Sequence, residues 1–233
     1  MKQTWCVVPA AGIGRRMQSS TPKQYLPLGA GCVIEATLAT LLQLENLRGI
    51  VVALDGQDPY WAETRYSAHP LVHRAAGGGE RADSVLHALT HLLEIADAAD
   101  WVMVHDAARP CVRLDDIARL QHACEQHQQG AILGMPVRDT MKISDGHHRI
   151  QSTAPRDNLW HAFTPQMFPL GLLARSLAMA LRSGAAVTDE ASAMELAGYR
   201  PLLVQGAADN IKITNPADLA LAEFYLSSRT AGA

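Results

Sequence analysis

The sequence predicts an α/β fold in which a mostly parallel β-sheet is flanked by helices. Apolar runs of strand length alternate along the chain with amphipathic segments of helix length, which is the pattern of successive β-α units. The strand-length runs are almost continuously apolar, as expected for strands that are buried on both faces. A chain of 233 residues is long enough for one substantial core, so we expect residues 1–233 to form a single domain.

Six strands and five helices are predicted from these runs. The strands are expected at residues 4–9, 49–54, 71–75, 101–105, 131–137 and 201–204. Four of the helices are expected at residues 33–44, 80–96, 115–128 and 171–183. The fifth begins near the end of the chain, where Asn215 is placed to cap it, Pro216 takes the first helical position and Asp218 lies in the first turn.

One segment breaks this alternation. Residues 138–153 contain an Asp145-Gly146 turn between two alternating runs, which is typical of a β-hairpin. The segment carries little apolar surface for a core of its own, and an isolated two-stranded hairpin is only marginally stable in water. We therefore expect a projecting β-arm that buries itself against a partner. A plain surface hairpin is the alternative.

Composition and charge exclude several classes of function. The chain is 48% hydrophobic and 18% charged, with a net charge of −3, so no broad basic field attracts nucleic acid or a membrane surface. No apolar stretch approaches the ~20 residues of a membrane span and no signal peptide opens the chain, so we expect a cytoplasmic protein. The four cysteines have no metal-site spacing and are expected to be buried in a reducing compartment.

The stretch VVPAAGIGRRMQSSTPKQY, which includes the end of the first predicted strand, is interpreted as a polyphosphate-binding loop. A dinucleotide fingerprint is excluded because Met17 stands where the third glycine belongs, and the P-loop spacing does not occur. Ala10, Ala11 and Gly12 are small enough for the backbone to approach a ligand and point N–H groups at phosphate oxygens. Arg15, Arg16 and Lys23 follow as local cations. An ordinary glycine turn is the alternative.

Two further strand-end loops are candidates for the same site, since ligands of parallel sheets bind beyond the carboxyl ends of the strands. The loop GGGERADSV is glycine-rich and offers Ser84 to a base edge, although a flexible connection has the same composition. The loop HDAARP offers Asp106 to a metal or a ribose, with helix capping as the alternative. His105 is expected to be packed rather than catalytic.

These motifs, taken in order, resemble one enzyme family. PAAGIGRRM, PKQY, GGGERADSV, HDAARP, RDTMK, TPQMF, TDEASAMELAG and NIKITNPADL follow one another as in the 2-C-methyl-D-erythritol 4-phosphate cytidylyltransferases, over nearly the whole chain from Val7 to about Leu221. The resemblance implies a Rossmann-like nucleotidyltransferase domain that transfers CMP from CTP to methylerythritol phosphate in the non-mevalonate isoprenoid pathway and releases pyrophosphate. It also implies a divalent cation such as Mg²⁺ and a homodimer whose arms, residues 138–153, embrace the partner.

The resemblance also implies residue roles. The catalytic set is Arg16, Lys23, Arg156 and Lys212. The nucleotide-binding set is Ala10, Ala11, Gly12, Gly14, Arg15, Gly78, Ser84 and Ala107. The acceptor-binding set is Asp106, Arg109, Thr140, Thr164 and Thr188, and the metal candidates are Asp106 and Asp209. Family members often carry an acidic residue where this chain has Gly79, which removes one expected ribose contact.

The mechanism implied by these residues needs no general base. The nucleophile is a substrate phosphate oxygen that is already anionic near neutral pH, and fixed cations counter the charge that develops on the triphosphate. Three alternatives remain at this point: a cytidylyltransferase for ribitol 5-phosphate or another polyol phosphate, a non-catalytic nucleotide-binding module, and, more distantly, an NAD-dependent oxidoreductase.

Overall fold

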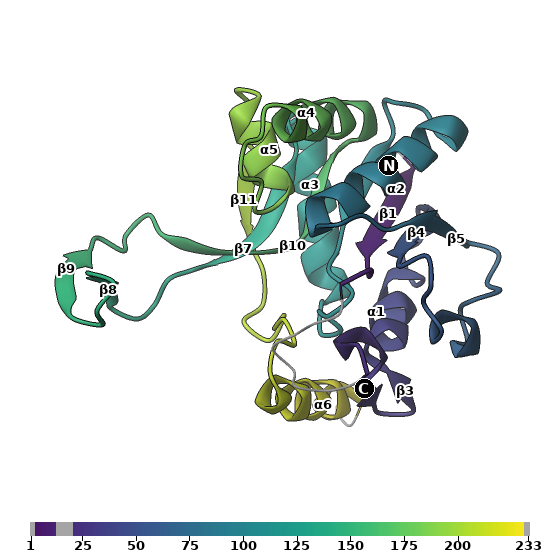
Figure 1. The fold of residues 1–233 in the computed structure, drawn as a ribbon, viewed down its shortest axis with the longest axis horizontal. Helices are drawn as coiled ribbons and strands as arrows, with labels where there is room; N and C mark the ends of the chain where they lie inside the picture. Colours follow the sequence, from purple (N-terminus) through teal and green to yellow (C-terminus); the bar gives the residue numbers. More distant parts are fainter. Residues whose placement is uncertain (1–2, 13–20, 231–233) are drawn as a thin grey trace.

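The computed structural model describes residues 3–12 and 21–230 and is built on a seven-stranded sheet (Figure 1). The strand order is β11-β7-β10-β6-β1-β4-β5. The strands are β1 (Thr4–Pro9), β4 (Leu47–Leu54), β5 (Val72–Ala76), β6 (Trp101–Val104), β7 (Ala131–Pro136), β10 (Trp160–Pro169) and β11 (Leu202–Gln205). All neighbouring pairs are parallel except the two made by β10, which runs antiparallel to both β6 and β7.

Helices cover both faces of this sheet. The helices are α1 (Val33–Leu41), α2 (Arg81–Ile95), α3 (Leu114–Gln126), α4 (Leu170–Arg182), α5 (Glu190–Leu196) and α6 (Pro216–Thr230). On one face α2, α4 and α5 pack against Val7 and Val51, and on the other α1 and α3 pack against Cys6 and Val8. Successive residues of a strand point to opposite faces, so the unbroken apolar run of β1 supplies both cores. The predicted α/β fold class is confirmed.

A third, smaller core attaches α6 to the body. Val33, Cys111, Ile213 and Ala222 are buried together in it. Asn215 and Asp218 bond reciprocally at the start of the helix, where each side chain accepts from the other residue's backbone N–H. This is the capping box that the sequence predicts, with Pro216 as the first helical residue.

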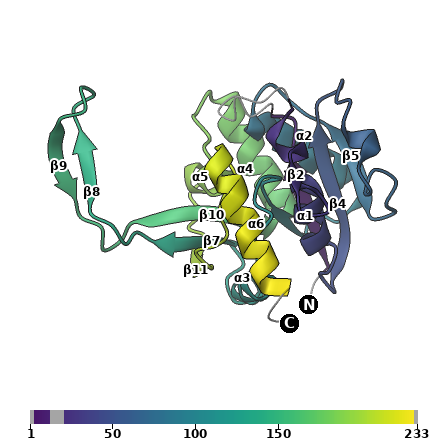
Figure 2. The ribbon, with the colours of Figure 1, turned by 90° about the horizontal axis from the view of Figure 1, so that it is seen from below.

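The β-arm has the predicted hairpin and projects away from the body (Figures 1 and 2). Its strands are β8 (Met141–Ser144) and β9 (Ile150–Ala154), which pair antiparallel around a turn in which Gly146 has a φ of 83°. A positive φ of this kind favours glycine. Met141, Ile143 and Ile150 are exposed, and Ile150 keeps 69% of its surface accessible.

Sequence patterns missed β10, α5 and a short hairpin of β2 (Pro27–Leu28) and β3 (Gly31–Cys32). Strand β10 contains two prolines and separated polar residues, and its ladder with β7 shifts register between Ala162 and Gln166. Such a strand lacks the periodicity of an isolated β-pattern, and its place in the sheet is decided by neighbours that are distant in sequence. The predicted strands and helices are all present, with ends displaced by up to three residues.

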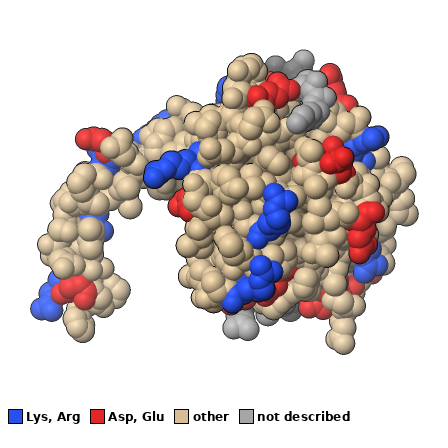
Figure 3. All heavy atoms as spheres, turned by 90° about the horizontal axis from the view of Figure 1, so that it is seen from above, with Lys and Arg blue, Asp and Glu red and all other residues tan. Residues whose placement is uncertain are grey.

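The charge distribution agrees with the small net charge. On the face shown in Figure 3, basic and acidic side chains are scattered among neutral ones and neither sign dominates. Among residues 3–12 and 21–230, no helix combines the length and apolar character that crossing a bilayer requires. All four cysteines are unpaired thiols, and three of them are buried as expected, whereas Cys32 is half-buried.

Candidate functional site

A cleft with a cavity volume of about 260 Å³ lies beyond the carboxyl ends of β1, β5 and β6. This is the edge at which parallel sheets bind ligands. The loops that follow these strands form most of the lining, together with the segment around Lys23 and the side chain of Lys212. The lining residues are Pro9, Ala10, Ala11, Gly12, Lys23, Gln24, Gly78, Gly79, Glu80, Arg81, Ser84, Asp106, Ala107, Ala108 and Lys212.

The loop that follows β1 and the loop that follows β5 pack closely against each other, at Ala11 and Gly77. A Cβ on Gly77 would overlap the Cβ of Ala11, so only glycine permits this approach. The N–H of Gly77 donates to the Leu54 carbonyl at 2.6 Å, and the N–H of Gly78 donates to the hydroxyl of Ser84 at 2.9 Å. Ser84 therefore fixes the glycine loop, in addition to lining the cleft. The loops present backbone and small groups to a ligand.

Lys23 begins a short 3₁₀ helix, Lys23–Tyr25, at the entrance to the cleft. Its ammonium donates to the carbonyl of Ile213 at 3.0 Å, which brings it beside the segment that bears Lys212. The neighbouring Gln24 is buried and donates to the Ala10 carbonyl at 2.7 Å. These two bonds hold a cation against the loop after β1, although Lys23 and Gln24 lie 11 and 12 positions beyond its first glycine, Gly12.

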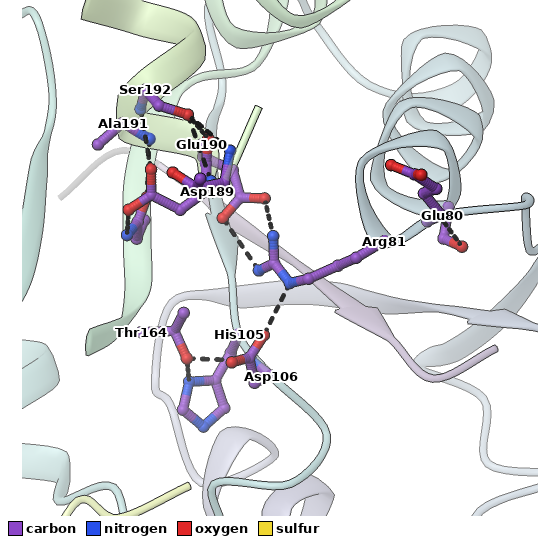
Figure 4. Close-up of polar contacts among 12 residues, drawn as sticks. Glu80, Arg81, His105, Asp106, Thr164, Asp189, Glu190, Ala191 and Ser192 are labelled. Carbon is purple, nitrogen blue, oxygen red and sulfur yellow. Dashed lines mark hydrogen bonds and ion pairs between the residues drawn. The ribbon is translucent and has the colours of Figure 1, made fainter. Parts of the chain in front are cut away.

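A buried carboxylate, Asp106, is the centre of a chain of ion pairs in the cleft (Figure 4). One oxygen accepts from Arg81 at 2.9 Å, and the other lies 2.8 Å from Lys212 and 3.6 Å from Arg109. Burial alone raises the pKa of Asp106, but Arg81, Lys212 and Arg109 outweigh burial and hold the pKa well below its usual range. The carboxylate is therefore ionised throughout the physiological range.

Arg81 is held in turn by Glu190, the first residue of α5. Its two terminal nitrogens donate to the two Glu190 oxygens at 2.7 and 3.1 Å, which is the bidentate geometry that arginine and carboxylate favour. Burial lowers the pKa of Arg81, but Glu190 and Asp106 outweigh it and the net pKa is raised. Helices α2 and α5, from different parts of the chain, thus meet at the cleft through one guanidinium.

Comparison with known proteins identifies the family. The family model for 2-C-methyl-D-erythritol 4-phosphate cytidylyltransferase matches residues 4–228. A curated relative of that name from Vibrio vulnificus is 52% identical over 221 residues, which cover 95% of this chain and 93% of the relative. A second from Pseudomonas paraeruginosa is 54% identical over 216 residues, 92% of each chain. The chain belongs to the 2-C-methyl-D-erythritol 4-phosphate cytidylyltransferase family.

Solved structures of the family have the same fold. The crystal structure of a 4-diphosphocytidyl-2C-methyl-D-erythritol synthase matches with a TM-score of 0.84 at 37% identity, covering 97% of this chain and 99% of the other. The Francisella tularensis enzyme of the family matches with a TM-score of 0.83 at 35% identity, covering 96% and 99%. These matches confirm the predicted nucleotidyltransferase class, and the reaction that names the family is the one predicted from the motifs.

The cleft is lined by half of the residues that the family resemblance singled out. Nine of them line it: Ala10, Ala11, Gly12, Lys23, Gly78, Ser84, Asp106, Ala107 and Lys212. Arg109 and Thr164 are buried behind the cleft, in contact with Asp106. Gly14, Arg15 and Arg16 lie outside the described residues. Gly79 has open space around it, since a Cβ there would meet only Asp83 at 3.7 Å, so an acidic side chain would fit.

Three further predicted site residues lie neither in the lining of the cleft nor among the buried groups behind it. Thr140 and Arg156 are exposed on or beside the β-arm, and Arg156 donates to the backbone carbonyl of Arg138. Thr188 is exposed just before α5, where its N–H donates to the Ser192 hydroxyl. These positions bring no contact with Asp106 or Lys212 within one chain.

Asp209, the second metal candidate, is engaged elsewhere. Its carboxylate accepts from Arg113 at 2.6 Å and from Arg229 at 2.8 Å, and it does not line the cleft. Arg229 comes from α6 and Arg113 precedes α3, so the aspartate clamps the last helix to the body. We do not retain Asp209 as a metal ligand, because it lies away from the cleft and its carboxylate is used to hold Arg113 and Arg229.

Sequence reasoning missed Arg81 and Glu190. Both lie inside motifs that carry the family resemblance, GGGERADSV and TDEASAMELAG. An arginine directly after a glycine-rich loop was a usable signal for an anion or carboxylate contact. Glu190 gave no such signal, since an acidic residue at the start of a helix is normally a solvated residue that favours the helix dipole.

Behind the cleft, His105 is buried and neutral. Its Nε2–H donates to the Arg109 carbonyl and its Nδ1 accepts from the Thr164 hydroxyl, both at 3.0 Å. Burial lowers the pKa of His105 from its usual value of 6.5 to about 4. The expectation that this histidine is packed is confirmed.

The pKa of His105 predicts a pH dependence of stability. Because the folded-state pKa is lower, the unfolded chain binds the proton first, so the stabilisation is complete above pH ~6.5 and is lost as the pH falls towards about 4. Between pH ~7 and pH ~4 the loss is about 3 kcal/mol, at ~1.36 kcal/mol per pKa unit. Urea unfolding at a series of pH values across this range measures the loss of folding stability. His105→Gln should flatten the slope relative to wild type, whereas exposed His147→Gln should leave it unchanged. Equal slopes in all three proteins would contradict the assignment.

Proposed function

We propose that this cleft transfers CMP from CTP to 2-C-methyl-D-erythritol 4-phosphate. The observation that carries the proposal is the juxtaposition of two packed backbone loops with the side chains of Lys23 and Lys212 and the buried carboxylate of Asp106. Membership of the family over residues 4–228 supports the choice of nucleotide and acceptor. Residues 1–233 then act as one nucleotidyltransferase domain.

The nucleotide occupies the side formed by the two loops. Ala10, Ala11, Gly12 and Gly78 leave the backbone N–H groups accessible to phosphate and base, and the small lining favours a pyrimidine over a purine. Ser84 contributes its hydroxyl at the edge of this side. The resemblance assigns Arg16 to the triphosphate and Gly14 and Arg15 to nucleotide binding, and all three lie outside the described residues. Ala107, which directly follows Asp106, also lines the cleft.

The acceptor occupies the side formed by Asp106 and Lys212. A phosphate oxygen of the acceptor attacks the α-phosphorus of CTP, the bond to the β-phosphate oxygen breaks, and pyrophosphate leaves. Lys212 exchanges its contact with Asp106 for the acceptor phosphate, and Lys23 stabilises charge on the triphosphate. The nucleophile is already an anion, so the protein supplies position and charge compensation, and no side chain has to remove a proton.

The residues present fit a divalent cation bound mainly by the substrate. Within the part of the chain that the structure describes, no cluster of three or more potential protein ligands occurs. Mg²⁺ typically uses one or two carboxylates and completes its shell with phosphate oxygens and water, which suits Asp106 as the one protein ligand. Such a cation would polarise the phosphoryl oxygens and offset the charge of the triphosphate.

The β-arm supplies a homodimer contact in this proposal. Thr140 and Arg156 are exposed on or beside the arm and do not line their own cleft, so they reach an acceptor only in a second copy of the chain. The exposed Met141, Ile143 and Ile150 provide apolar surface for that contact. The four free thiols suit a reducing compartment, and we keep the cytoplasm as the expected location.

Substrate choice is tested by pyrophosphate release with purified protein and Mg²⁺. CTP with methylerythritol phosphate should turn over at least about 100-fold faster than ATP or GTP, since we propose that the small lining of the two loops selects a pyrimidine. Ribitol 5-phosphate should be a poorer acceptor by a comparable factor. Equal rates with ATP would refute the nucleotide assignment, and faster transfer to ribitol 5-phosphate would favour the sister cytidylyltransferase activity.

Removal of the Lys23 ammonium tests its catalytic role. Lys23→Ala should lower kcat by about 10²–10³, as expected for a preorganised group that stabilises developing charge. Loss of its bond to Ile213 should cost about 1–2 kcal/mol of stability, measured by urea unfolding. Arg48→Ala, an exposed cation at the opposite edge of the sheet, is the control and should change neither quantity. An unchanged kcat with a raised KM would make Lys23 a binding residue only.

Sites shared between subunits are tested by complementation. Lys23→Ala and Arg156→Ala chains should each be inactive alone, because each lacks one half of the site. Mixed under conditions of demonstrated subunit exchange, they should regain about a quarter of wild-type activity, since half of the dimers are mixed and one of their two sites is intact. Continued inactivity of the mixture would place Arg156 in its own chain's site or outside catalysis.

A further inference from the structure

A closed circuit of four hydrogen bonds lies behind the acceptor side of the cleft. His105 donates to the Arg109 carbonyl at 3.0 Å, and the Arg109 side chain donates to the Asn210 carbonyl at 2.6 Å. The Asn210 side chain donates to the Thr164 carbonyl at 2.9 Å, and the Thr164 hydroxyl pairs with His105 Nδ1 at 3.0 Å. All four residues are buried, none with more than 8% of its surface exposed. Figure 4 includes the His105–Thr164 part of the circuit.

Each bond of the circuit has one possible direction. The Arg109 carbonyl only accepts, so Nε2 of His105 carries the proton, and in the neutral ring Nδ1 must then accept. The Thr164 hydroxyl therefore donates to His105, and its oxygen accepts the N–H of Asp106 at 3.0 Å. Burial of His105 favours the neutral ring that this arrangement requires. A protonated ring would have no lone pair for Thr164.

The circuit fixes groups of the cleft that it does not itself include. Through Thr164 it holds the backbone of Asp106, and through Arg109 it places a guanidinium 3.6 Å from the Asp106 carboxylate. Asn210 lies two residues before Lys212, and the residue after Lys212 is anchored in turn, since the Ile213 N–H donates to the Ala108 carbonyl at 2.8 Å. Neither His105 nor Asn210 lines the cleft.

We infer that His105 and Asn210 are positioning residues for the acceptor side of the cleft, acting through the closed hydrogen-bond circuit with Arg109 and Thr164. The inference rests on the proposed function, because it assigns the acceptor to the side of Asp106 and Lys212. The nucleotide side is held by other bonds, from Gly77, Gly78 and Gln24, which share no residue with the circuit. Breaking the circuit therefore displaces the acceptor groups and leaves the nucleotide loops in place.

Steady-state kinetics and direct measurement of CTP binding distinguish an effect on the acceptor side of the cleft from an effect on the nucleotide side. Asn210→Ala removes the donor to Thr164, and His105→Gln retains a donor for Arg109 while removing the acceptor for the Thr164 hydroxyl. Both variants should raise KM for methylerythritol phosphate about 10- to 100-fold, since small displacements of positioning groups have effects of this size. The Kd of CTP with Mg²⁺, measured by calorimetry, should change by less than about twofold.

Gln121→Ala is the matched control for loss of a buried amide. Gln121 is buried on α3 and donates to Asn46 at 3.1 Å, near the opposite edge of the sheet. This variant should be less stable than the wild type, but its KM for methylerythritol phosphate and its Kd for CTP should be unchanged. Folded circuit variants with unchanged KM for the acceptor, or with CTP binding weakened to the same extent, would overturn the inference. Absence of turnover in the wild type would overturn the proposed function and the inference with it.

Nitrogen NMR of the histidine rings gives a readout that does not depend on activity. At pH ~7 the signal assigned to His105 by its loss in His105→Gln should be that of the neutral Nε2–H tautomer. Asn210→Ala should shift this signal, whereas Gln121→Ala should not. An Nδ1–H tautomer or an imidazolium at pH ~7 would mean that the circuit does not close, and would overturn the inference.

Discussion

The buried carboxylate of Asp106 is the constraint on which the rest of the cleft depends. An ionised carboxylate in this position is tolerable only because Arg81, Lys212 and Arg109 compensate its charge. Arg81 needs a second carboxylate in turn, and Glu190 provides it from α5. Removing one member of such a buried network typically costs ~3–5 kcal/mol, since it leaves an uncompensated charge. The same ion pairs therefore hold α2 and α5 together and compensate the charge of Asp106 in the cleft.

The antiparallel strand β10 does most to position the groups on the side of the cleft proposed to bind the acceptor. It enters the sheet between β6 and β7, so Thr164 comes beside the loop that follows β6 and bonds to His105 and Asp106. The same strand continues the chain from the β-arm, which begins after β7. One strand thus connects the buried groups behind the cleft with the surface proposed to contact a second copy. The groups behind the cleft and the proposed dimer contact therefore lie on one continuous stretch of backbone.

Much of this organisation can be predicted from the sequence, because it depends on interactions between residues that are close together in the chain. The continuous apolar run of residues 4–9, the capping residues before α6 and the Asp145-Gly146 turn each specify a structure through interactions with near neighbours. The glycine loops and the HDAARP motif indicated the edge of the sheet at which the cleft is found. Asp209 was proposed as a metal ligand because a sequence cannot show which cations will reach a carboxylate, and two arginines from distant elements do so.

The sequence by itself determined the α/β class, the positions of the predicted strands and helices, the family and the small residues of the loops that line the cleft, because periodicity and chain order decide these features. The tertiary structure alone decided that Arg81 and Glu190 complete the site, that β10 runs antiparallel through the sheet, and that His105 and Asn210 close a circuit behind it. Each of these depends on residues that lie far apart in the chain, and their charges and hydrogen-bond partners are fixed only when the elements pack.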